Sequence, residues 1–430
     1  MIRTLLRRKI TGDLIFLYAS FFAGFVLPLL TIPYLTRVLD KEAWGRIVYV
    51  QSFCFLLGVP LAWGFGYHGT RLVARHRDDR EKVGALCSEI TTARLMMMPL
   101  VGLVFLVSLA ALPALRQDVR LPVFGFAAVA INAMSAGWIL QGLDRMRLSS
   151  ALDLTGKAVA TLPVFVFVSA PEDAYIIFLL QGLGALVSLV PAYRAVCREI
   201  PLRLRLSRNL FQIYRESSGM FLFSLSASIV NQTNSFLFGL LAPLPAVGTY
   251  AIAEKIIRAV AALVGPFSTA LHTKINYRIG KDRAWAARLF VVGTAVLFVA
   301  ALAAAGIIWL ASDLIITRLF GPGYRDSVAA LRLLSVLPVI HWLSYSINLN
   351  WLIVLGQDRR LNLCVFCAAI AAIVSAIILV PHFSVTGMAL SVLVTESTLL
   401  AALATTLIKT KQNPVRIAFF SGAGKADAGS

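Results

Sequence analysis

Three charged residues lie well inside an apolar stretch of the sequence that is long enough to cross a bilayer. The stretch covers residues 248–273, and the charged residues are Glu254, Lys255 and Arg258. On a helical wheel they fall within an arc of about 100°. An ionised side chain at bilayer depth costs about 2.5–3.5 kcal/mol on insertion scales, so such an arc turns toward a wet cavity. We therefore predict a membrane protein with a charged interior.

Lys255 and Arg258 are suited to one kind of chemistry, which is the binding of an anion. They share a helix face, and Glu254 cancels only one of their two charges. The same face continues through Ala262 and Gly265, which leave room for a ligand. In the alternative interpretation, Glu254 pairs with Arg258 at i, i+4 inside a packed bundle, but this gives Lys255 no role.

Glu396 is an acidic residue near the middle of the last apolar stretch. It stands among Ser391, Thr395 and Thr398, and no basic residue lies within a helical turn of it. A carboxyl group isolated at membrane depth is a candidate for proton exchange during transport. The alternative is a neutral acid that is hydrogen-bonded within the bundle. We select Glu396, with Glu254, as the candidate residues for ion coupling.

The composition predicts a polytopic membrane protein. Of the 430 residues, 59% are hydrophobic and 14% are charged, and the mean hydropathy is +0.80, whereas a soluble domain has about 25% charged residues. The net charge of +19 would indicate nucleic-acid binding in a soluble protein, but here it marks one side of a membrane, and no nucleic acid is predicted. The sequence has no P-loop, dinucleotide fingerprint or H-E-x-x-H motif, so we predict no cofactor and no metal.

Twelve apolar windows have about the 20 residues that are needed to cross some 30 Å of hydrocarbon. They are residues 14–35, 47–66, 89–112, 121–142, 152–170, 174–193, 217–241, 248–271, 289–312, 329–355, 361–380 and 386–408. If the N-terminus is cytoplasmic, the segments on that side hold 28 Lys and Arg residues, against 7 on the other side. By the positive-inside rule, both termini are predicted to be cytoplasmic.

The longest basic connector, residues 194–216, separates the windows into two sets of six. We predict an all-α protein with two six-helix lobes around a central cavity. Its parts are an N-terminal lobe over 1–200, a basic cytoplasmic linker over 201–216, a C-terminal lobe over 217–410 and a disordered cytoplasmic tail over 411–430. Six is even, so the halves can form a parallel repeat. Two short matches support it, Ala43-Trp44-Gly45 with Ala246-Val247-Gly248 and Gly142-x-Asp144-Arg145 with Gly356-x-Asp358-Arg359.

Three segments resemble one family of transporters. They are PLLTIPYLTRVL in the first window, GWILQGLDRM at the end of the fourth and VGTYAIAEKIIRA at the start of the eighth. They are similar to the Wzx-type O-antigen and polysaccharide flippases of the multidrug/oligosaccharidyl-lipid/polysaccharide (MOP) exporter superfamily. The resemblance implies a lipopolysaccharide-related transporter of the bacterial inner membrane. It would move an undecaprenyl-pyrophosphate-linked oligosaccharide from the cytoplasmic to the periplasmic leaflet by alternating access, with membrane lipid and a polysaccharide polymerase as candidate partners.

The same resemblance assigns roles to individual residues. The cationic cavity residues of the family match Lys255 and Arg258, and also Arg37, which lies at the periplasmic rim of our first window. A guanidinium is a planar fork that suits pyrophosphate. Sugar hydroxyls need uncharged hydrogen-bonding groups, each of which could alternatively make an interhelical hydrogen bond worth about 0.6 kcal/mol. The groups that we select are Gln51, Asn231 and Asn234.

Other functions remain open on the sequence. A peptidoglycan-precursor flippase is the nearest alternative. A drug/cation antiporter of the same superfamily would have a lumen lined by carboxylates, whereas the eighth window carries two cations and one acid. A membrane glycosyltransferase or polymerase would need a sizeable outer loop, and the largest outer connector, 313–328, holds only about 16 residues.

Overall fold

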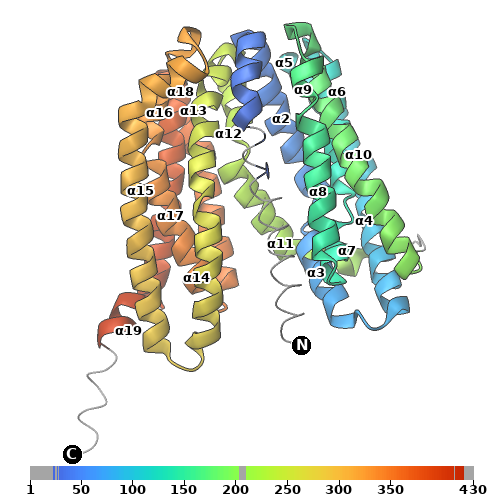
Figure 1. Cartoon of the computed structure of the whole chain (residues 1–430), viewed down its shortest axis with the longest axis vertical. Helices are drawn as coiled ribbons and strands as arrows, with labels where there is room; N and C mark the ends of the chain where they lie inside the picture. Colours follow the sequence, from blue (N-terminus) through green and yellow to red (C-terminus); the bar gives the residue numbers. More distant parts are fainter. Residues whose placement is uncertain (1–22, 25–26, 28, 203–209, 411, 421–430) are drawn as a thin grey trace, which may run out of the picture. The chain divides into compact units, whose positions relative to one another are not determined.

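The computed structural model describes residues 23–24, 27, 29–202, 210–410 and 412–420, and in these ranges its regular elements are helices (Figure 1). Residues 29–38 are helical. The helices after them are α2 (Lys41–Ala62), α3 (Phe65–His76), α4 (Arg80–Ala111), α5 (Pro113–Arg116), α6 (Arg120–Ala133), α7 (Gly137–Gly142), α8 (Met146–Thr161), α9 (Val164–Phe167), η1 (Pro171–Asp173), α10 (Ala174–Glu199), α11 (Leu210–Asn231), α12 (Asn234–Leu241), α13 (Leu244–Ala262), α14 (Val264–Ile279), α15 (Arg283–Leu319), η2 (Pro322–Tyr324), α16 (Ser327–Leu334), α17 (Leu337–Ile347), η3 (Asn348–Leu352), α18 (Asp358–Lys409) and α19 (Pro414–Phe420).

The all-α polytopic architecture is confirmed. Among the described residues, eight helical segments are long and apolar enough to cross a membrane. These eight contain nine of the twelve predicted windows, because α18 covers the last two and is kinked between them at Ser384, where φ is 47°. Residues 14–22, 25–26 and 28 of the first window lie outside the described residues. The seventh and eighth windows are each divided, between α11 and α12 and between α13 and α14.

The described chain packs as two compact units. Unit 1 comprises residues 1–239 and 243–248, and unit 2 comprises residues 240–242 and 249–430. Helix α13 therefore begins in unit 1 and continues in unit 2. Residues 203–209 of the predicted linker, and residues 411 and 421–430 of the predicted tail, lie outside the described residues. Within the predicted tail, residues 414–420 form α19 instead.

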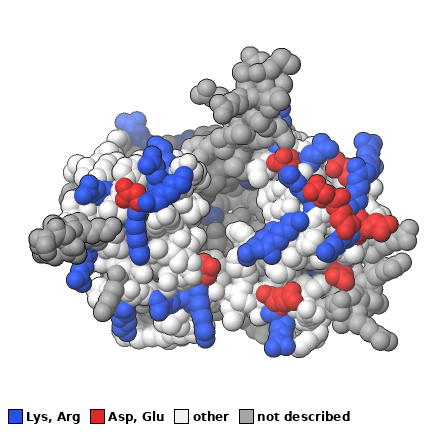
Figure 2. Space-filling model, turned by 90° about the horizontal axis from the view of Figure 1, so that it is seen from below, with Lys and Arg blue, Asp and Glu red and all other residues white. Residues whose placement is uncertain are grey.

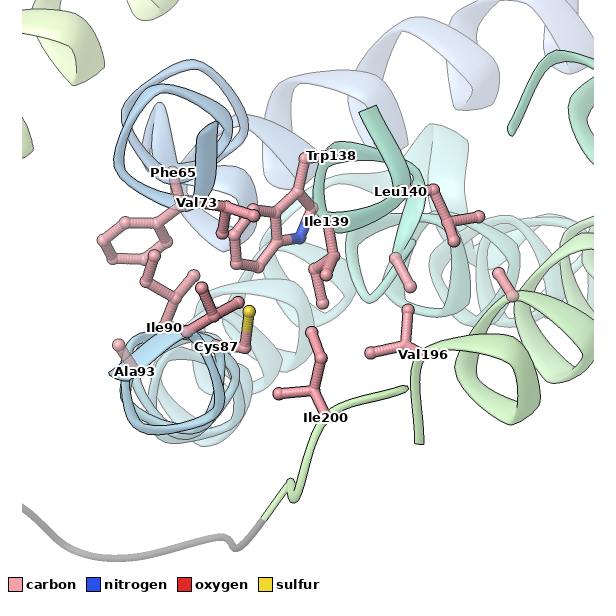
Figure 3. Packing of buried hydrophobic residues seen from close by; sticks show 13 residues of the cluster. Phe65, Val73, Cys87, Ile90, Ala93, Trp138, Ile139, Leu140, Val196 and Ile200 are labelled. Atoms are coloured by element: carbon pink, nitrogen blue, oxygen red, sulfur yellow. The ribbon is translucent and has the colours of Figure 1, made fainter. Parts of the chain in front are cut away.

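Unit 1 has a hydrophobic cluster where α3, α4, α7 and α10 meet (Figure 3). Phe65 of α3 and Ile90 of α4 are almost fully buried, and Trp138 of α7 covers them with an exposed fraction of 7%. Val196 of α10 and Ile200, the residue after it ends, close the other side. Inside a membrane protein such packing holds helices together through van der Waals contact. The cluster therefore fixes the short helix α7 on the longer ones.

Arg94 is a buried cation in unit 1 that the sequence analysis left without a role. It lies on α4, and its side chain is 4% exposed. Nη1 donates to the carbonyl oxygens of Ala133 at 3.0 Å and Ser135 at 3.1 Å, and the guanidinium lies over the ring of Trp138. These carbonyls sit where α6 ends, and they would otherwise lack helical partners. Arg94 thus stabilises the break between α6 and α7.

Two glycines of the predicted repeat contact each other inside unit 1. A Cβ atom on Gly45 of α2 would collide with the carbonyl oxygen of Leu244 and lie 3.0 Å from the Gly248 nitrogen. A Cβ atom on Gly248 would lie 2.7 Å from the Lys41 carbonyl oxygen and 3.1 Å from the Gly45 nitrogen. Each glycine thus faces the residue four positions before the other. This reciprocal contact is the one expected of two copies related by a two-fold axis, and it supports the internal repeat.

Each unit carries basic residues at the end where its predicted cytoplasmic connectors lie. The connector between α3 and α4 exposes Arg75, Arg77 and Arg80, and that between α14 and α15 exposes Lys281 and Arg283. Figure 2, which views this end, shows Lys and Arg side chains on both units. Basic side chains are thus exposed at this end of each unit (Figure 2).

Candidate functional site

The charged residues Glu254, Lys255 and Arg258 lie on helix α13, in the part of the helix that belongs to unit 2. Two hydrogen bonds hold this part. The Thr249 carbonyl accepts from Oγ of Ser327 on α16 at 2.7 Å, and the Ala261 carbonyl accepts from Nε1 of Trp342 on α17 at 3.0 Å. Both ends of the segment are thereby tied to the helices that face it. The segment of α13 between Thr249 and Ala261, with its charged side chains, is therefore fixed against α16 and α17.

Arg258 stands between two carboxylates. Its Nε lies 3.9 Å from Oε1 of Glu254, one turn earlier on α13, and its Nη1 lies 3.8 Å from Oε1 of Glu396 on α18. The Arg258 side chain is 20% exposed, whereas Glu254 is 12% and Glu396 is 1% exposed. The structure thus brings together the predicted anion-binding residue and both predicted ion-coupling residues. The guanidinium is the most accessible of the three groups.

His341 of α17 is the second partner of Glu396. Its Nδ1 lies 3.2 Å from Oε1 and 3.4 Å from Oε2 of Glu396, and its side chain is 21% exposed. When Glu396 is ionised, its carboxylate can only accept, so Nδ1 is then the donor in this contact. Sequence reasoning missed His341, although an ionisable residue in the middle of the window 329–355 was itself a signal of function.

The folds of α17 and α18 explain how His341 and Glu396 meet. Helix α17 starts at Leu337 with Pro338 in its first turn, a favoured position for proline. Trp342, the neighbour of His341, is bonded to α13 as described above. In α18, Oγ of Ser375 lies 2.7 Å from Oγ of Ser391, which joins the two arms of the kinked helix. Glu396 lies little more than one turn beyond Ser391, so its position follows from this junction.

One sequence prediction needs correction here. Glu396 was expected to be isolated from basic residues, but α13 and α17 bring Arg258 and His341 to it. The eighth window itself holds two cations and one acid, as counted in the sequence. With Glu396 added, two acids balance Lys255 and Arg258, and His341 is the group that can change the total. Lys255 is half-buried and follows Glu254 on α13.

The other predicted site residues belong to unit 1. Arg37 is exposed, Gln51 on α2 is half-buried, and Asn234 at the start of α12 is 2% exposed. Asn231 ends α11, and its Nδ2 donates to the carbonyl oxygen of Ala227 at 2.9 Å. Asn231 and Asn234 thus flank the break between α11 and α12. Their contribution to a sugar site stays a prediction, as does that of Arg37 and Gln51.

The described residues contain no group of three or more His, Cys, Asp or Glu side chains that could hold a metal ion. The cluster on α13, α17 and α18 is instead a set of compensating charges. Such a set can exchange one partner for another without leaving a charge exposed to hydrocarbon. By its composition, such a set is suited to the reversible binding of an anion, a cation or a proton.

The fold and this site define a multi-pass α-helical membrane transporter. Residues 10–272 match the family described as polysaccharide biosynthesis protein, and the chain belongs to that family. The predicted resemblance to the MOP superfamily and the prediction of a transporter are both confirmed by this match together with the similarities below.

One curated relative, named "Putative O-antigen transporter", comes from Escherichia coli (strain K12). It is 23% identical over 384 residues, which are 87% of this chain and 91% of the relative. The structure of the lipid II flippase MurJ in an inward closed conformation superposes with a TM-score of 0.71 and 14% identity, covering 94% of this chain and 90% of that one. An inward-facing multidrug resistance MATE family transporter of the MOP superfamily superposes with a TM-score of 0.65 and 15% identity, covering 91% and 98% of the two chains. At these identities the structural matches concern the fold.

Proposed function

We propose that the protein moves an undecaprenyl-pyrophosphate-linked oligosaccharide, the repeat unit of an O-antigen or a related polysaccharide, across the bacterial inner membrane. The direction is from the cytoplasmic to the periplasmic leaflet, by alternating access. The polysaccharide family and the name of the Escherichia coli relative support the sugar. The likeness to a lipid II flippase supports a lipid-linked substrate.

Arg258 is the observation that carries this proposal. A lipid-linked pyrophosphate is an anion that must be shielded from hydrocarbon, and a guanidinium matches its oxygens with two parallel hydrogen bonds. Arg258 offers this group from a membrane-length segment and is still 20% exposed. Lys255, three residues earlier on the same face, adds a second positive charge. We assign these two residues to the pyrophosphate.

Broken helices support a transport mechanism of this kind. Transporters build their sites from discontinuous helices, where freed backbone groups can face a ligand. Here α11 gives way to α12 at residues 232–233, and α13 gives way to α14 at residue 263. Asn231 and Asn234 flank the first break, so we assign them, with Gln51, to sugar hydroxyls. Arg37 is assigned to the anionic part of the substrate at the periplasmic side.

The orientation of the protein is part of the proposal. The basic residues at one end of each unit support cytoplasmic termini, because Lys and Arg accumulate in cytoplasmic connectors. With that orientation, the substrate enters the protein from the cytoplasmic side, where nucleotide sugars are available. A polysaccharide polymerase on the periplasmic side is then the expected consumer of the product.

A flipping assay in proteoliposomes tests the function. Fluorescently labelled undecaprenyl-pyrophosphate-linked O-antigen units, lipid II and a cationic dye would be compared as substrates. We expect flipping of the O-antigen unit and its loss in the Lys255→Ala/Arg258→Ala double variant. The matched control is Lys274→Ala/Arg278→Ala, which removes the same two charge types from exposed positions on α14.

The same assay decides between the candidates. Flipping of lipid II alone would assign the protein to peptidoglycan precursors. Transport of the dye alone would assign it to cation antiport, for which the two carboxylates beside Arg258 are the relevant groups. Flipping of the O-antigen unit by the double variant at the wild-type rate would remove the assignment of Lys255 and Arg258.

A further inference from the structure

The contacts of Arg258 create a competition that substrate binding has to resolve. The guanidinium is shared by Glu254 and Glu396. A pyrophosphate that forms two parallel hydrogen bonds with the guanidinium displaces these carboxylates. Glu254 remains 12% exposed, but Glu396 is 1% exposed and would lose its contact with the Arg258 cation. A buried carboxylate without a counter-ion is strongly unfavourable, so a replacement is needed.

We propose that His341 binds a proton when an anion occupies Arg258, and that it then serves as the counter-ion of Glu396. This inference rests on the proposed function, because it takes the anion to be the substrate pyrophosphate. It adds a proton-binding residue and states when the proton arrives. The anion and the proton bind together at one cluster.

The geometry allows this exchange without movement of the histidine. Nδ1 of His341 already lies 3.2 Å from Oε1 of Glu396 and donates to it. The proton from solvent therefore binds at the other ring nitrogen, Nε2, and the existing hydrogen bond becomes one between imidazolium and carboxylate. The side chain of His341 is 21% exposed, which leaves a route for that proton.

The charges around His341 and Glu396 also favour a protonated His341 when an anion is bound. The titratable and charged groups near this pair are Tyr250, Glu254, Lys255 and Arg258 on α13 and Tyr345 on α17. On α16, Arg332 is bonded elsewhere, because its Nε donates to Oγ of Ser312 at 2.9 Å. With a neutral His341, the two acids and two cations cancel. A protonated His341 makes the cluster positive, which favours an anion.

Linkage fixes the sign of the pH dependence. If anion binding raises the proton occupancy of His341, protons must raise the affinity for the anion by the same factor. Anion affinity should therefore increase as the pH falls through the range in which histidine titrates. For one linked proton the limit is about tenfold per pH unit. Anion binding that took up no proton would show no such dependence.

Calorimetry measures the linked proton directly. The full-length protein in nanodiscs would be titrated with undecaprenyl pyrophosphate at pH 7 in two buffers with different heats of ionisation. We expect the wild type to take up as much as one proton per bound lipid. His341→Gln and Glu396→Gln should bind the lipid without this uptake. The control His382→Gln removes an exposed histidine of α18 whose Nδ1 lies 2.9 Å from the Ile378 carbonyl, and it should behave as wild type.

The variants also account for protons that belong to the lipid. Any proton exchanged by the pyrophosphate itself is common to all four proteins, so the difference between wild type and His341→Gln isolates the histidine. Should Glu396→Gln fail to fold, His341→Gln alone carries the comparison. Equal uptake in wild type and His341→Gln would overturn the inference while leaving the proposed function intact. Absence of lipid binding by the wild type would instead overturn the proposed function, and the inference with it.

Discussion

Nη1 of Arg258 on α13 lies 3.8 Å from Oε1 of Glu396 on α18. The two residues were selected for different reasons, the first as an anion ligand and the second as an ion-coupling group. Their proximity means that the removal of one residue also changes the environment of the other. Single variants are therefore interpreted together with variants of the partner residues.

Arg258 is the first target. We expect Arg258→Ala to abolish export of surface glycan, and Arg258→Lys to recover part of it, because the charge survives while the bidentate fork is lost. If Arg258 only neutralises Glu254, Arg258→Ala should lower membrane abundance and Glu254→Gln should restore both abundance and export. If Arg258 binds substrate, Glu254→Gln restores abundance alone. Export and abundance are measured on the same cells, and normal export by Arg258→Ala would exclude the anion site.

Glu396 allows a test of how much a buried carboxylate contributes to stability. Its side chain is 1% exposed and keeps His341 as a partner. We expect Glu396→Gln to fold, since the amide oxygen can still accept from Nδ1 of His341. Glu396→Ala removes a carboxylate from both His341 and Arg258 and should destabilise by about 3–5 kcal/mol.

The matched comparison for Glu396 is an ion pair near the surface. Nη2 of Arg145 lies 2.7 Å from Oε1 of Glu199, and these side chains are 56% and 37% exposed. Glu199→Ala should change stability by no more than about 1 kcal/mol, because solvent screens such pairs. Thermal unfolding in detergent measures both variants. Equal losses at the two sites would mean that Glu396 is not an obligatory partner in the cluster.

The sequence was sufficient for the fold but not for the partners within the site. Span lengths and the charge count depend on local composition, so α15 and the two arms of α18 were predicted directly. The neighbours of Glu396 were not, because helical periodicity relates residues of one helix only. Arg258 and His341 come from two other helices, and their meeting depends on how α13, α17 and α18 pack. No pattern within a single window contains that information.

The breaks within helices were the second feature that the sequence analysis did not predict. The eighth window was predicted as one span, yet it divides into α13 and α14 at Leu263, shortly before Gly265 and Pro266. Pro266 has no N–H to donate to the carbonyl oxygen of Ala262, so this break did have a local signal. Arg94 shows why other breaks are hard to predict. The end of α6 is stabilised by a side chain from α4, about 40 residues earlier in the chain. A break that depends on a distant donor leaves no local mark.

Arg94 itself yields a structural prediction. Its Nη1 satisfies the carbonyl oxygens of Ala133 and Ser135, so Arg94→Leu would leave both acceptors without this donor. A buried group left without its hydrogen bond costs about 1–3 kcal/mol. We expect lower membrane abundance and a lower unfolding temperature, with export per molecule unchanged. A loss of export at wild-type abundance would instead place Arg94 in the transport pathway.

The orientation can be tested with single cysteines. The five native cysteines, of which Cys197 and Cys367 are exposed, would first be replaced. Cysteines at Lys281, in the connector between α14 and α15, and at Arg77, between α3 and α4, should be shielded from an impermeant thiol reagent in intact cells. One at Asp118, between α5 and α6, should react. Permeabilised cells provide the control, and the reverse pattern would invert the proposed direction of transport.

Gly45 and Gly248 provide the sharpest prediction about packing. The backbones of α2 and α13 touch at these residues, and a Cβ atom on Gly45 would collide with the Leu244 carbonyl oxygen. A backbone cannot yield as a flexible side chain does, so Gly45→Ala has to separate the helices. Overpacking of this kind costs about 1–3 kcal/mol, occasionally more. We expect Gly45→Ala to lower the unfolding temperature.

The reciprocal geometry predicts how the two substitutions combine. Because both glycines serve one contact, Gly248→Ala should be destabilising as well, and the double variant should lose less stability than the sum of the single variants. The control is Gly102→Ala on α4, where a Cβ atom would have no neighbour within 4 Å, so the substitution should be neutral or slightly stabilising. Unfolding temperatures of all four proteins in the same detergent test this. Additive losses at Gly45 and Gly248 would show that the two residues act at separate contacts, which the symmetric crossing of α2 and α13 does not allow.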